Sequence, residues 1–204
     1  MKKRNKIIIL IITIIMYIIN TMLVITNKYL TIDDQVHSFI RNSANNNMDK
    51  VMKVFTFFGS GTFIVLLTLI LLIVYLVKHK KNKAYIVGGA IALSTIVNNI
   101  IKLIIRRPRP EYITVVEKSF SYPSGHVMAA TTLYGVIIYL ISKSDLKKSL
   151  KTLYSILLVI LIILVGVSRI YLGAHYFSDV FGAMILSTSL LIAIDLFNEK
   201  KKLI

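Results

Sequence analysis

Six apolar runs of 17 to 24 residues constrain the fold of this chain more than any other feature of its sequence. Each run is about as long as a helix needs to be to cross a hydrocarbon core of roughly 30 Å. An ordinary soluble domain of 204 residues, 56% of them apolar, could not bury such runs of Ile, Leu and Val. We therefore expect an all-α, polytopic membrane protein in which one domain, residues 1–204, forms a bundle of six transmembrane helices. The predicted spans are Ile7–Ile25, Val54–Val77, Tyr85–Ile105, Gly125–Ile141, Leu153–Ile170 and His175–Phe197.

The first run follows Met1, Lys2, Lys3 and Arg4, as the apolar region of a signal peptide would. It is long, however, and no small-x-small cleavage site follows it. We interpret it as a retained membrane anchor.

A short helix is predicted between the first two spans. Thr31 is the predicted N-cap, because an acidic residue follows three positions later. Ile32, Val36, Phe39 and Ile40 then have the spacing of one helical face. We expect this helix to lie at the outer surface of the membrane.

The basic residues indicate the orientation of the spans. A formal net charge of +16 would suggest a nucleic-acid partner in a soluble protein, but here most Lys residues lie in clusters between apolar runs. Such clusters tend to stay in the cytoplasm and to contact anionic lipid head groups. Both termini are therefore predicted to be cytoplasmic, and a nucleic-acid partner is not expected. The clusters, fifteen of the 25 Lys and Arg, are Lys2, Lys3, Arg4, Lys6; Lys78, Lys80, Lys81, Lys83; Lys143, Lys147, Lys148, Lys151; and Lys200, Lys201, Lys202.

The chain has no cysteine, which excludes a disulfide framework and a thiolate metal site. The residues that are hardest to explain as structure occur in three polar segments on the predicted outer side. The first runs from Lys102 to Pro110 at the exit of the third span, where Pro108 and Pro110 are expected to end the helix. Lys102 and Arg109 can then face one point, although cations at this depth also snorkel to the interface without a chemical role.

The second segment, Ser121 to His126, directly precedes an apolar helix. Unpaired amides at a helix start bind anions, and Gly125 allows the backbone to approach a phosphate closely. The alternative is that Ser124 is only an N-cap and His126 an interfacial residue.

The third segment contains Ser168, Arg169, His175 and Asp179. His175 and Asp179 are four residues apart at the predicted start of the last span, so the carboxylate can accept a proton from the imidazole. This pairing would fix the tautomer and leave the other ring nitrogen as a nucleophile. Because charged groups are costly within a membrane, a functional role is the default explanation.

Together the three segments provide what phosphoryl transfer requires. The transition state keeps negative charge on three oxygens, so catalysis depends on positioning and on fixed positive charge. Arginine adds bidentate hydrogen bonding to phosphate oxygens. A nucleophile and an acid are also needed on opposite sides of phosphorus, and we assign these roles to His175 and His126 respectively. The predicted positive and hydrogen-bonding groups are Lys102, Arg109, Arg169 and Ser124.

The spacing of these residues resembles the three-part signature of the type 2 phosphatidic acid phosphatase family. The matching segments are Lys102-x6-Arg109-Pro110, Pro123-Ser124-Gly125-His126 and Ser168-Arg169-x5-His175-x3-Asp179, which fix eleven positions between residues 102 and 179. A bundle of six helices in about 200 residues is also similar to the small bacterial members.

The resemblance implies that phosphate is bound by Lys102, Arg109, Ser124, Gly125 and Arg169. It also implies that His126 protonates the leaving group, that His175 attacks phosphorus and that Asp179 orients His175. It also implies a phosphohistidine intermediate without a metal or other cofactor. The implied substrate is phosphatidylglycerol phosphate, phosphatidic acid or undecaprenyl diphosphate, and the sequence does not choose among them.

Two other kinds of protein are compatible with part of this pattern. A carrier or channel for anions would use the same cations but would not explain the pairing of His175 with Asp179. A non-catalytic protein that binds lipid head groups would keep the site without turnover. Asn98, one turn before Lys102, either supports the site or joins two helices, and Arg106 and Arg107 either bind a second phosphate or contact lipid head groups. No feature of the sequence indicates an oligomeric state.

Overall fold

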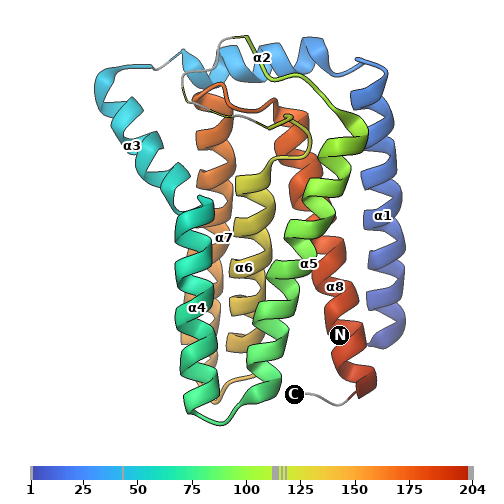
Figure 1. The fold of residues 1–204 in the computed structure, drawn as a ribbon, viewed down its shortest axis with the longest axis vertical. Helices are drawn as coiled ribbons and strands as arrows, with labels where there is room; N and C mark the ends of the chain where they lie inside the picture. Colours follow the sequence, from blue (N-terminus) through green and yellow to red (C-terminus); the bar gives the residue numbers. More distant parts are fainter. Residues whose placement is uncertain (1, 43, 112–114, 116, 118, 202–204) are drawn as a thin grey trace.

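The computed structural model describes residues 2–42, 44–111, 115, 117 and 119–201, and all regular secondary structure within them is helical (Figure 1). Position 202, one of the predicted cytoplasmic lysines, lies outside the described residues. In chain order the described helices are α1 (Lys3–Ile25), α2 (Leu30–Arg41), α3 (Asn46–Phe57), α4 (Gly61–Val77), α5 (Lys81–Ile105), α6 (Gly125–Ser142), α7 (Lys148–Tyr171) and α8 (Phe177–Lys201).

Five of these helices, α1, α5, α6, α7 and α8, are long and apolar enough to cross a membrane singly. A sixth crossing is obtained only if α3 and α4, which meet at an angle of 41°, are counted as one span. The prediction of one continuous helix over Val54–Val77 is therefore wrong, because α3 ends at Phe57 and α4 begins at Gly61.

A helix cap and a tertiary contact both lie at the break between α3 and α4. Ser60 caps α4, since its side chain accepts a hydrogen bond from the Phe63 amide at 3.3 Å. A Cβ atom on Gly59 would lie 2.6 Å from Val165 Cγ1 and 3.1 Å from the His126 carbonyl oxygen. Glycine is needed here because the chain passes directly against α7 and the start of α6.

The connection between α1 and α4 differs from the prediction of a single helix, because it contains both α2 and α3. α2 lies across the end of the bundle (Figure 1). Thr31 is not its cap, since the helix begins at Leu30 after Tyr29. The predicted apolar face is divided: Val36 and Ile40 pack against the core, whereas Ile32 and Phe39 are exposed. Asp33, in the first turn, is fully buried.

α6 is the central helix of the bundle, and it contacts α4, α5, α7 and α8. Half of the residues in its most apolar 18-residue stretch are buried, whereas only 11% of those in the corresponding stretch of α1 are buried. α1 packs mainly against α8 and exposes a series of isoleucines. In a bilayer such a surface faces lipid, so the helix does not need a protein partner on every side.

The start of α1 and the end of α8 lie at one end of the bundle, opposite α2 (Figure 1). The Lys6 ammonium joins α1 to α8 there, with distances of 2.5 Å to both Asp195 and Glu199. The connections from α4 to α5 and from α6 to α7 are at the same end. The predicted lysine clusters in the described part of the chain are therefore all at this end of the bundle.

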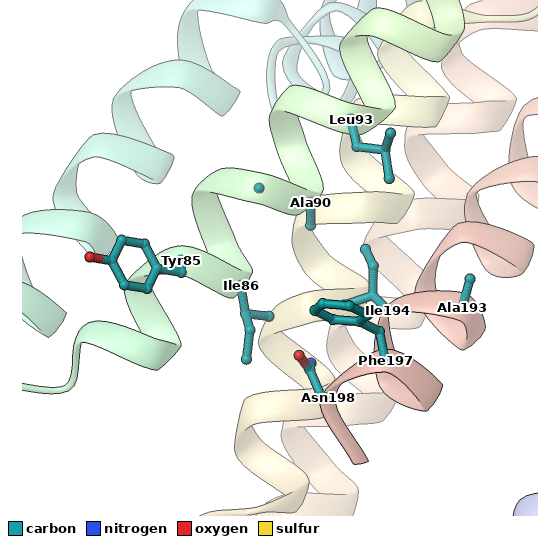
Figure 2. A pocket seen from close by; sticks show the side chains of 9 residues that line it. Tyr85, Ile86, Ala90, Leu93, Ala193, Ile194, Phe197 and Asn198 are labelled. Atoms are coloured by element: carbon teal, nitrogen blue, oxygen red, sulfur yellow. The ribbon is translucent and has the colours of Figure 1, made fainter. Parts of the chain in front are cut away.

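An apolar pocket of about 350 Å³ lies between α5 and α8 near this end (Figure 2). None of its lining side chains belongs to the three sequence segments described above, and Asp, Glu, Lys, Arg and His are absent from it. It is therefore not a candidate site for phosphate chemistry. Its lining residues are Tyr85, Ile86, Gly89, Ala90, Leu93, Ala193, Ile194, Phe197 and Asn198.

Candidate active site

The three polar segments meet at the end of the bundle opposite the termini. They occupy the end of α5, the connection from α5 to α6, the start of α6, the end of α7 and the start of α8. Backbone hydrogen bonds join them, because the Ser124 amide donates to the Asp179 carbonyl at 3.2 Å and the Ser121 amide donates to the Arg107 carbonyl at 2.9 Å. The helix ends are thus held against one another by the main chain.

The end of α5 agrees with the expectation that the helix stops before Pro108. The last helical residue is Ile105, and Arg106 follows with a left-handed φ of 49° while its amide donates to the Lys102 carbonyl at 3.0 Å. The Lys102 ammonium donates to the Phe120 and Ser121 carbonyls, and Arg109 also reaches the Phe120 carbonyl, at 3.5 Å. The two cations therefore converge on one point of the connection from α5 to α6.

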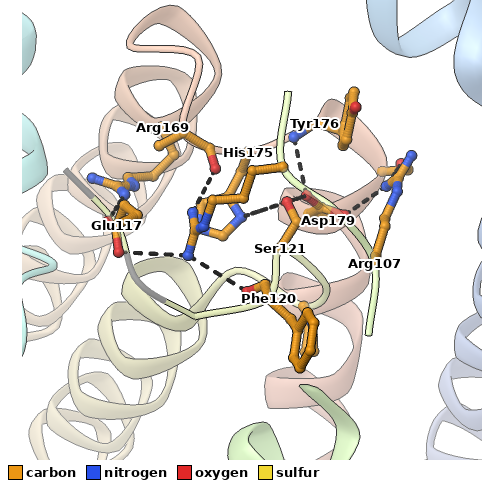
Figure 3. Close-up of polar contacts among 12 residues, drawn as sticks. Arg107, Glu117, Phe120, Ser121, Arg169, His175, Tyr176 and Asp179 are labelled. Atoms are coloured by element: carbon orange, nitrogen blue, oxygen red, sulfur yellow. Dashed lines mark hydrogen bonds and ion pairs between the residues drawn. The ribbon is translucent and has the colours of Figure 1, made fainter. Parts of the chain in front are cut away.

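His175 and Asp179 are paired, but not on one helix as predicted, because α8 begins at Phe177 and His175 lies in the bend before it. The Asp179 carboxylate turns back over the first turn, where Oδ2 accepts the Tyr176 amide at 3.0 Å and lies 3.4 Å from His175 Nδ1. Ser121 Oγ donates to the same oxygen at 2.5 Å (Figure 3). The carboxylate therefore fixes both the helix start and the imidazole.

The other ring nitrogen of His175 faces the cations. Nε2 lies 3.3 Å from Arg109 Nη1, and the side chain as a whole is 2% exposed. Burial lowers the pKa of His175 to about 4, although the hydrogen bond to Asp179 acts in the opposite direction. The imidazole is consequently neutral near pH 7, and with the Nδ1 proton directed to Asp179 the lone pair is on Nε2.

Arg107 holds Asp179 from the opposite side, and its two carboxylate partners were not predicted from the sequence. Nη1 donates to Asp179 Oδ1 at 2.6 Å (Figure 3), and Nη2 donates to Asp33 Oδ2 at 2.8 Å. Asp33 also accepts the Ser178 amide at 2.9 Å and the Ser178 hydroxyl at 2.7 Å. The Arg107 guanidinium is thus bound by two carboxylates that are themselves fully buried.

The pKa of Arg107 is raised by this arrangement. Burial alone would lower it, but the charges of Asp179 and Asp33 and their hydrogen bonds outweigh the loss of solvent. α2 is in this way connected to the paired His175 and Asp179 by a chain of buried ionic hydrogen bonds. Arg106, by contrast, is exposed, and its Nε donates to the Leu103 carbonyl at 2.9 Å.

Glu117 lies among the remaining cations. It forms an ion pair with Arg169 Nη2, its Oε2 lies 3.5 Å from Arg109 Nη2, and its Oε1 lies 4.0 Å from His126 Nδ1. Burial would raise the pKa of Glu117, but Arg169 and Arg109 outweigh that effect and keep it below its usual value. A charged carboxylate thus lies between His126 and the two arginines. We call the three residues around this carboxylate, namely Arg109, Arg169 and His126, the anion cradle.

The other predicted phosphate-binding residues surround the cradle. Asn98 donates to the Pro123 carbonyl at 3.4 Å, and its Oδ1 lies beside Gly125, so it joins α5 to the loop before α6. Ser124 precedes α6 as expected, but its hydroxyl makes no cap hydrogen bond and is buried without a partner among the described residues. The Lys102 side chain lies beside Gly125, because its Cε atom would be 4.0 Å from a Cβ atom added to that glycine.

Two cavities adjoin this arrangement. One of about 180 Å³ is lined by residues that include Asn98, Gly125 and His126. The other, of about 460 Å³, is lined by residues that include Lys102, Arg107, Arg109 and Phe120. No group of three His, Asp or Glu side chains in the described part of the chain is arranged to hold a metal ion.

Three residues of this site were not assigned a role from the sequence motifs. Ser121 belongs to a quoted segment but has no special spacing, and Asp33 was interpreted only as part of a helix start. Glu117 is one of only nine acidic residues in a chain with 25 basic ones, and it lies in the connection that also carries Arg106, Arg107 and Arg109. A carboxylate in a connection with several arginines was the signal that could have identified it.

Comparisons with known proteins agree with this site. A model of the PAP2 superfamily matches residues 83–202, which include all three polar segments. Phosphatidylglycerophosphatase B of Bacillus subtilis (strain 168) is 34% identical over 158 residues, which cover 76% of this chain and 77% of that protein.

Two crystal structures also have this fold. A PAP2 type phosphatidylglycerolphosphate phosphatase from Bacillus subtilis superposes with a TM-score of 0.87 and 27% identity, over 94% of this chain and 96% of that one. LpxE of Aquifex aeolicus superposes with a TM-score of 0.62 and 26% identity, over 79% of this chain and 93% of that one. The sequence match, the shared fold and the segments that meet at one end of the bundle lead to one conclusion: this chain belongs to the PAP2 superfamily and is a multi-pass membrane phosphatase of the PAP2 type.

Proposed function

We propose that this enzyme hydrolyses a lipid phosphate through a phosphohistidine intermediate on His175, without a metal ion. The observation that carries the proposal is the placement of the two imidazoles. His175 Nε2 lies 3.3 Å from Arg109 Nη1, and His126 Nδ1 lies 4.0 Å from the Glu117 carboxylate that Arg109 and Arg169 bind. We infer that a phosphate group bound by the same cations has one imidazole on each side, as in-line displacement requires.

In the first step, His175 Nε2 forms a bond to phosphorus while the bond from phosphorus to the lipid oxygen breaks, and His126 donates a proton to that oxygen. Asp179 accepts a hydrogen bond from the Nδ1–H group and stabilises the positive charge that develops on the ring. Ser121 and Arg107 keep Asp179 in position through hydrogen bonds of 2.5 and 2.6 Å.

In the second step, water attacks phosphorus, its proton passes to His126, and the bond between phosphorus and Nε2 breaks. Arg109, Arg169 and Lys102 stabilise the charge on the phosphoryl oxygens in both steps. The amides at the start of α6 and the Ser124 hydroxyl add hydrogen-bond donors, and Gly125 leaves room for the phosphate to approach them.

A phosphomonoester such as phosphatidylglycerol phosphate is the favoured substrate. The curated relative and the more similar crystal structure both carry the name of a phosphatidylglycerol phosphate phosphatase, and Arg107, which could otherwise bind a second phosphate, is paired with Asp33 and Asp179. Phosphatidic acid carries the same terminal group. Undecaprenyl diphosphate would require another cation for its second phosphate.

The site is proposed to face the non-cytoplasmic side, with both termini in the cytoplasm and α2 at the outer interface, because the lysine clusters lie at the other end of the bundle. The natural chain has no cysteine, so a single introduced one can be labelled without background. Phe39→Cys, at a position 78% exposed, should react with an impermeant maleimide in intact cells. Lys80→Cys should react only after lysis. The reverse pattern would overturn this orientation.

The activity is tested with purified protein in detergent and a panel of the three lipid phosphates. Phosphate release in the presence of a chelator, inhibition by vanadate and loss of release in His175→Ala are expected. Full activity in a folded His175→Ala variant would contradict the mechanism. An anion carrier or a non-catalytic head-group-binding protein would bind these lipids without releasing phosphate.

A further inference from the structure

Glu117 occupies the position that a phosphate group needs. Within the described residues, its carboxylate is bound by the two arginines of the anion cradle and lies beside the third member, His126. A carboxylate has two oxygens and one negative charge, as does the charged part of a phosphodiester. It therefore resembles an anionic ligand of the site more closely than it resembles a catalytic group.

The cradle is held together without Glu117. Arg169 also donates to Thr56 Oγ1 at 2.7 Å, and Arg109 donates to the Ala174 carbonyl at 2.6 Å and the Ser119 carbonyl at 2.7 Å. Glu117 itself is outside any helix, and its side chain is 19% exposed. The cations are thus fixed by other contacts, whereas the carboxylate can leave by a change within the connection from α5 to α6.

Glu117 also leaves part of the cradle unsatisfied. Arg169 Nε is a buried donor without a hydrogen-bond partner among the described residues. The hydroxyl of Ser124, the residue directly before α6, is also buried without such a partner. Buried donors of this kind are costly unless a ligand accepts from them. A terminal phosphate, with three free oxygens, can accept more hydrogen bonds than a carboxylate can.

We propose that Glu117 is an internal competitor for the phosphate site, which binds the anion cradle of the free enzyme and is displaced only by a terminal phosphate group. The inference rests on the proposed function of the cradle as the phosphate site. Its consequence is selectivity. The phosphodiester head groups of surrounding lipids carry one charge and two free oxygens, so they cannot outcompete a tethered carboxylate, whereas a phosphomonoester of nearly two negative charges can.

The first test measures binding of inorganic phosphate to the purified protein by isothermal titration calorimetry. If the carboxylate occupies the cradle about nine-tenths of the time, Glu117→Gln should bind phosphate about tenfold more tightly than the natural protein, because the apparent affinity falls with the fraction of open sites. The control is Glu111→Gln, an exposed glutamate in the same connection whose loss removes the same charge. Its affinity for phosphate should not change.

The second test measures inhibition of phosphate release by phosphatidylglycerol, a phosphodiester lipid, in mixed micelles. Glu117→Gln should be inhibited at about tenfold lower phosphatidylglycerol than the natural protein, and its KM for a phosphomonoester should fall. Glu117→Ala provides a second variant, and size-exclusion profiles establish that each variant is folded.

Weaker or unchanged phosphate binding in both folded Glu117 variants would overturn the inference, since the carboxylate would then position the arginines or have no part in binding. These outcomes are separate from failure of the proposed function. Binding of inorganic phosphate requires no turnover, so tighter binding together with no phosphate release from any lipid would leave the competitor in place and remove the phosphatase mechanism.

Discussion

The two imidazoles of the candidate site have opposite surroundings. His175 is 2% exposed, and it is backed by Asp179, Ser121 and Arg107 through contacts that reach Asp33 in α2. His126 lies at the first turn of α6 with its side chain 24% exposed, and the nearest carboxylate, Glu117, is 4.0 Å away. One side of the site is a buried ionic network, and the other is partly exposed and bounded by Glu117.

This difference corresponds to two chemical tasks. A nucleophile must keep one orientation and one tautomer, and a buried, fully hydrogen-bonded partner provides both. The acid, by contrast, must meet a leaving lipid in one step and water in the next, so it must remain accessible. The variants below test whether the buried side and the open side have these separate roles.

His175→Ala should cause the largest loss of activity, because no other group can form the bond to phosphorus. We expect kcat to fall by at least about 10⁵-fold, in the range found when a catalytic nucleophile is removed. Phosphate release from phosphatidylglycerol phosphate measures it. His79→Asn, at the opposite end of the bundle with a left-handed φ of 54°, is the control and should retain full activity.

Asp179→Asn should be less damaging, since the nucleophile remains and only its orientation is weakened. The expected loss of kcat is roughly a hundredfold smaller than that of His175→Ala, by analogy with the orienting acid of a catalytic triad. Both variants are assayed under identical conditions. An equal and complete loss in a folded Asp179→Asn protein would show that the carboxylate has a direct chemical role.

His126→Ala should reduce kcat by roughly 10² to 10⁴-fold, the usual contribution of a general acid. The loss should depend on the leaving group, because a phenolate such as that of p-nitrophenyl phosphate departs without a proton. The measurement is the loss of kcat for the lipid phosphate divided by the loss of kcat for p-nitrophenyl phosphate. An equal loss for both substrates would assign His126 to binding and not to protonation.

Arg107→Ala should affect stability more than chemistry. It leaves Asp33 and Asp179 buried and uncompensated, and removal of one partner from a buried ion pair costs about 3–5 kcal/mol. The thermal midpoint in detergent should therefore fall, with a decrease in kcat of about tenfold from misorientation of His175. Arg106→Asn changes an exposed neighbour of the same charge and should leave the midpoint unaltered.

The acidic limb of the pH-rate profile should lie well below the ordinary range of histidine. Attack requires a neutral imidazole, and burial lowers the pKa of His175 to about 4, so on the acid side kcat/KM should fall only as the pH drops through that value. On the alkaline side kcat/KM should fall as His126, the proposed acid, loses its proton. The pH-rate profile of the purified enzyme checks this. An acidic limb near pH 6.5, the ordinary value for histidine, would show that His175 is solvated in the working enzyme.

Much of the fold followed from hydropathy, since α1, α5, α6, α7 and α8 lie where long apolar runs predict helices. The errors occur where a tertiary contact decides the local structure. α3 and α4 are separated because Gly59 packs against Val165 and His126, and a hydropathy pattern contains no information about that neighbour. Similarly, Thr31 had the residue pattern of an N-cap, but α2 already begins at Leu30. Asp33, in the first turn of α2, is buried and pairs with Arg107.

The sequence by itself determined the class of fold and the three segments that carry the chemistry, because span length, charge clusters and motif spacing are local properties of a chain. It also determined that His175 and Asp179 can pair, since they are four positions apart in the chain. Only the tertiary structure decided which charges meet across the bundle: Arg107 with Asp33 and Asp179, and Glu117 with Arg109 and Arg169. The physical reason is that a buried charge takes the partner that packing brings within about 3 Å, and that choice depends on distance in space and not on distance in sequence.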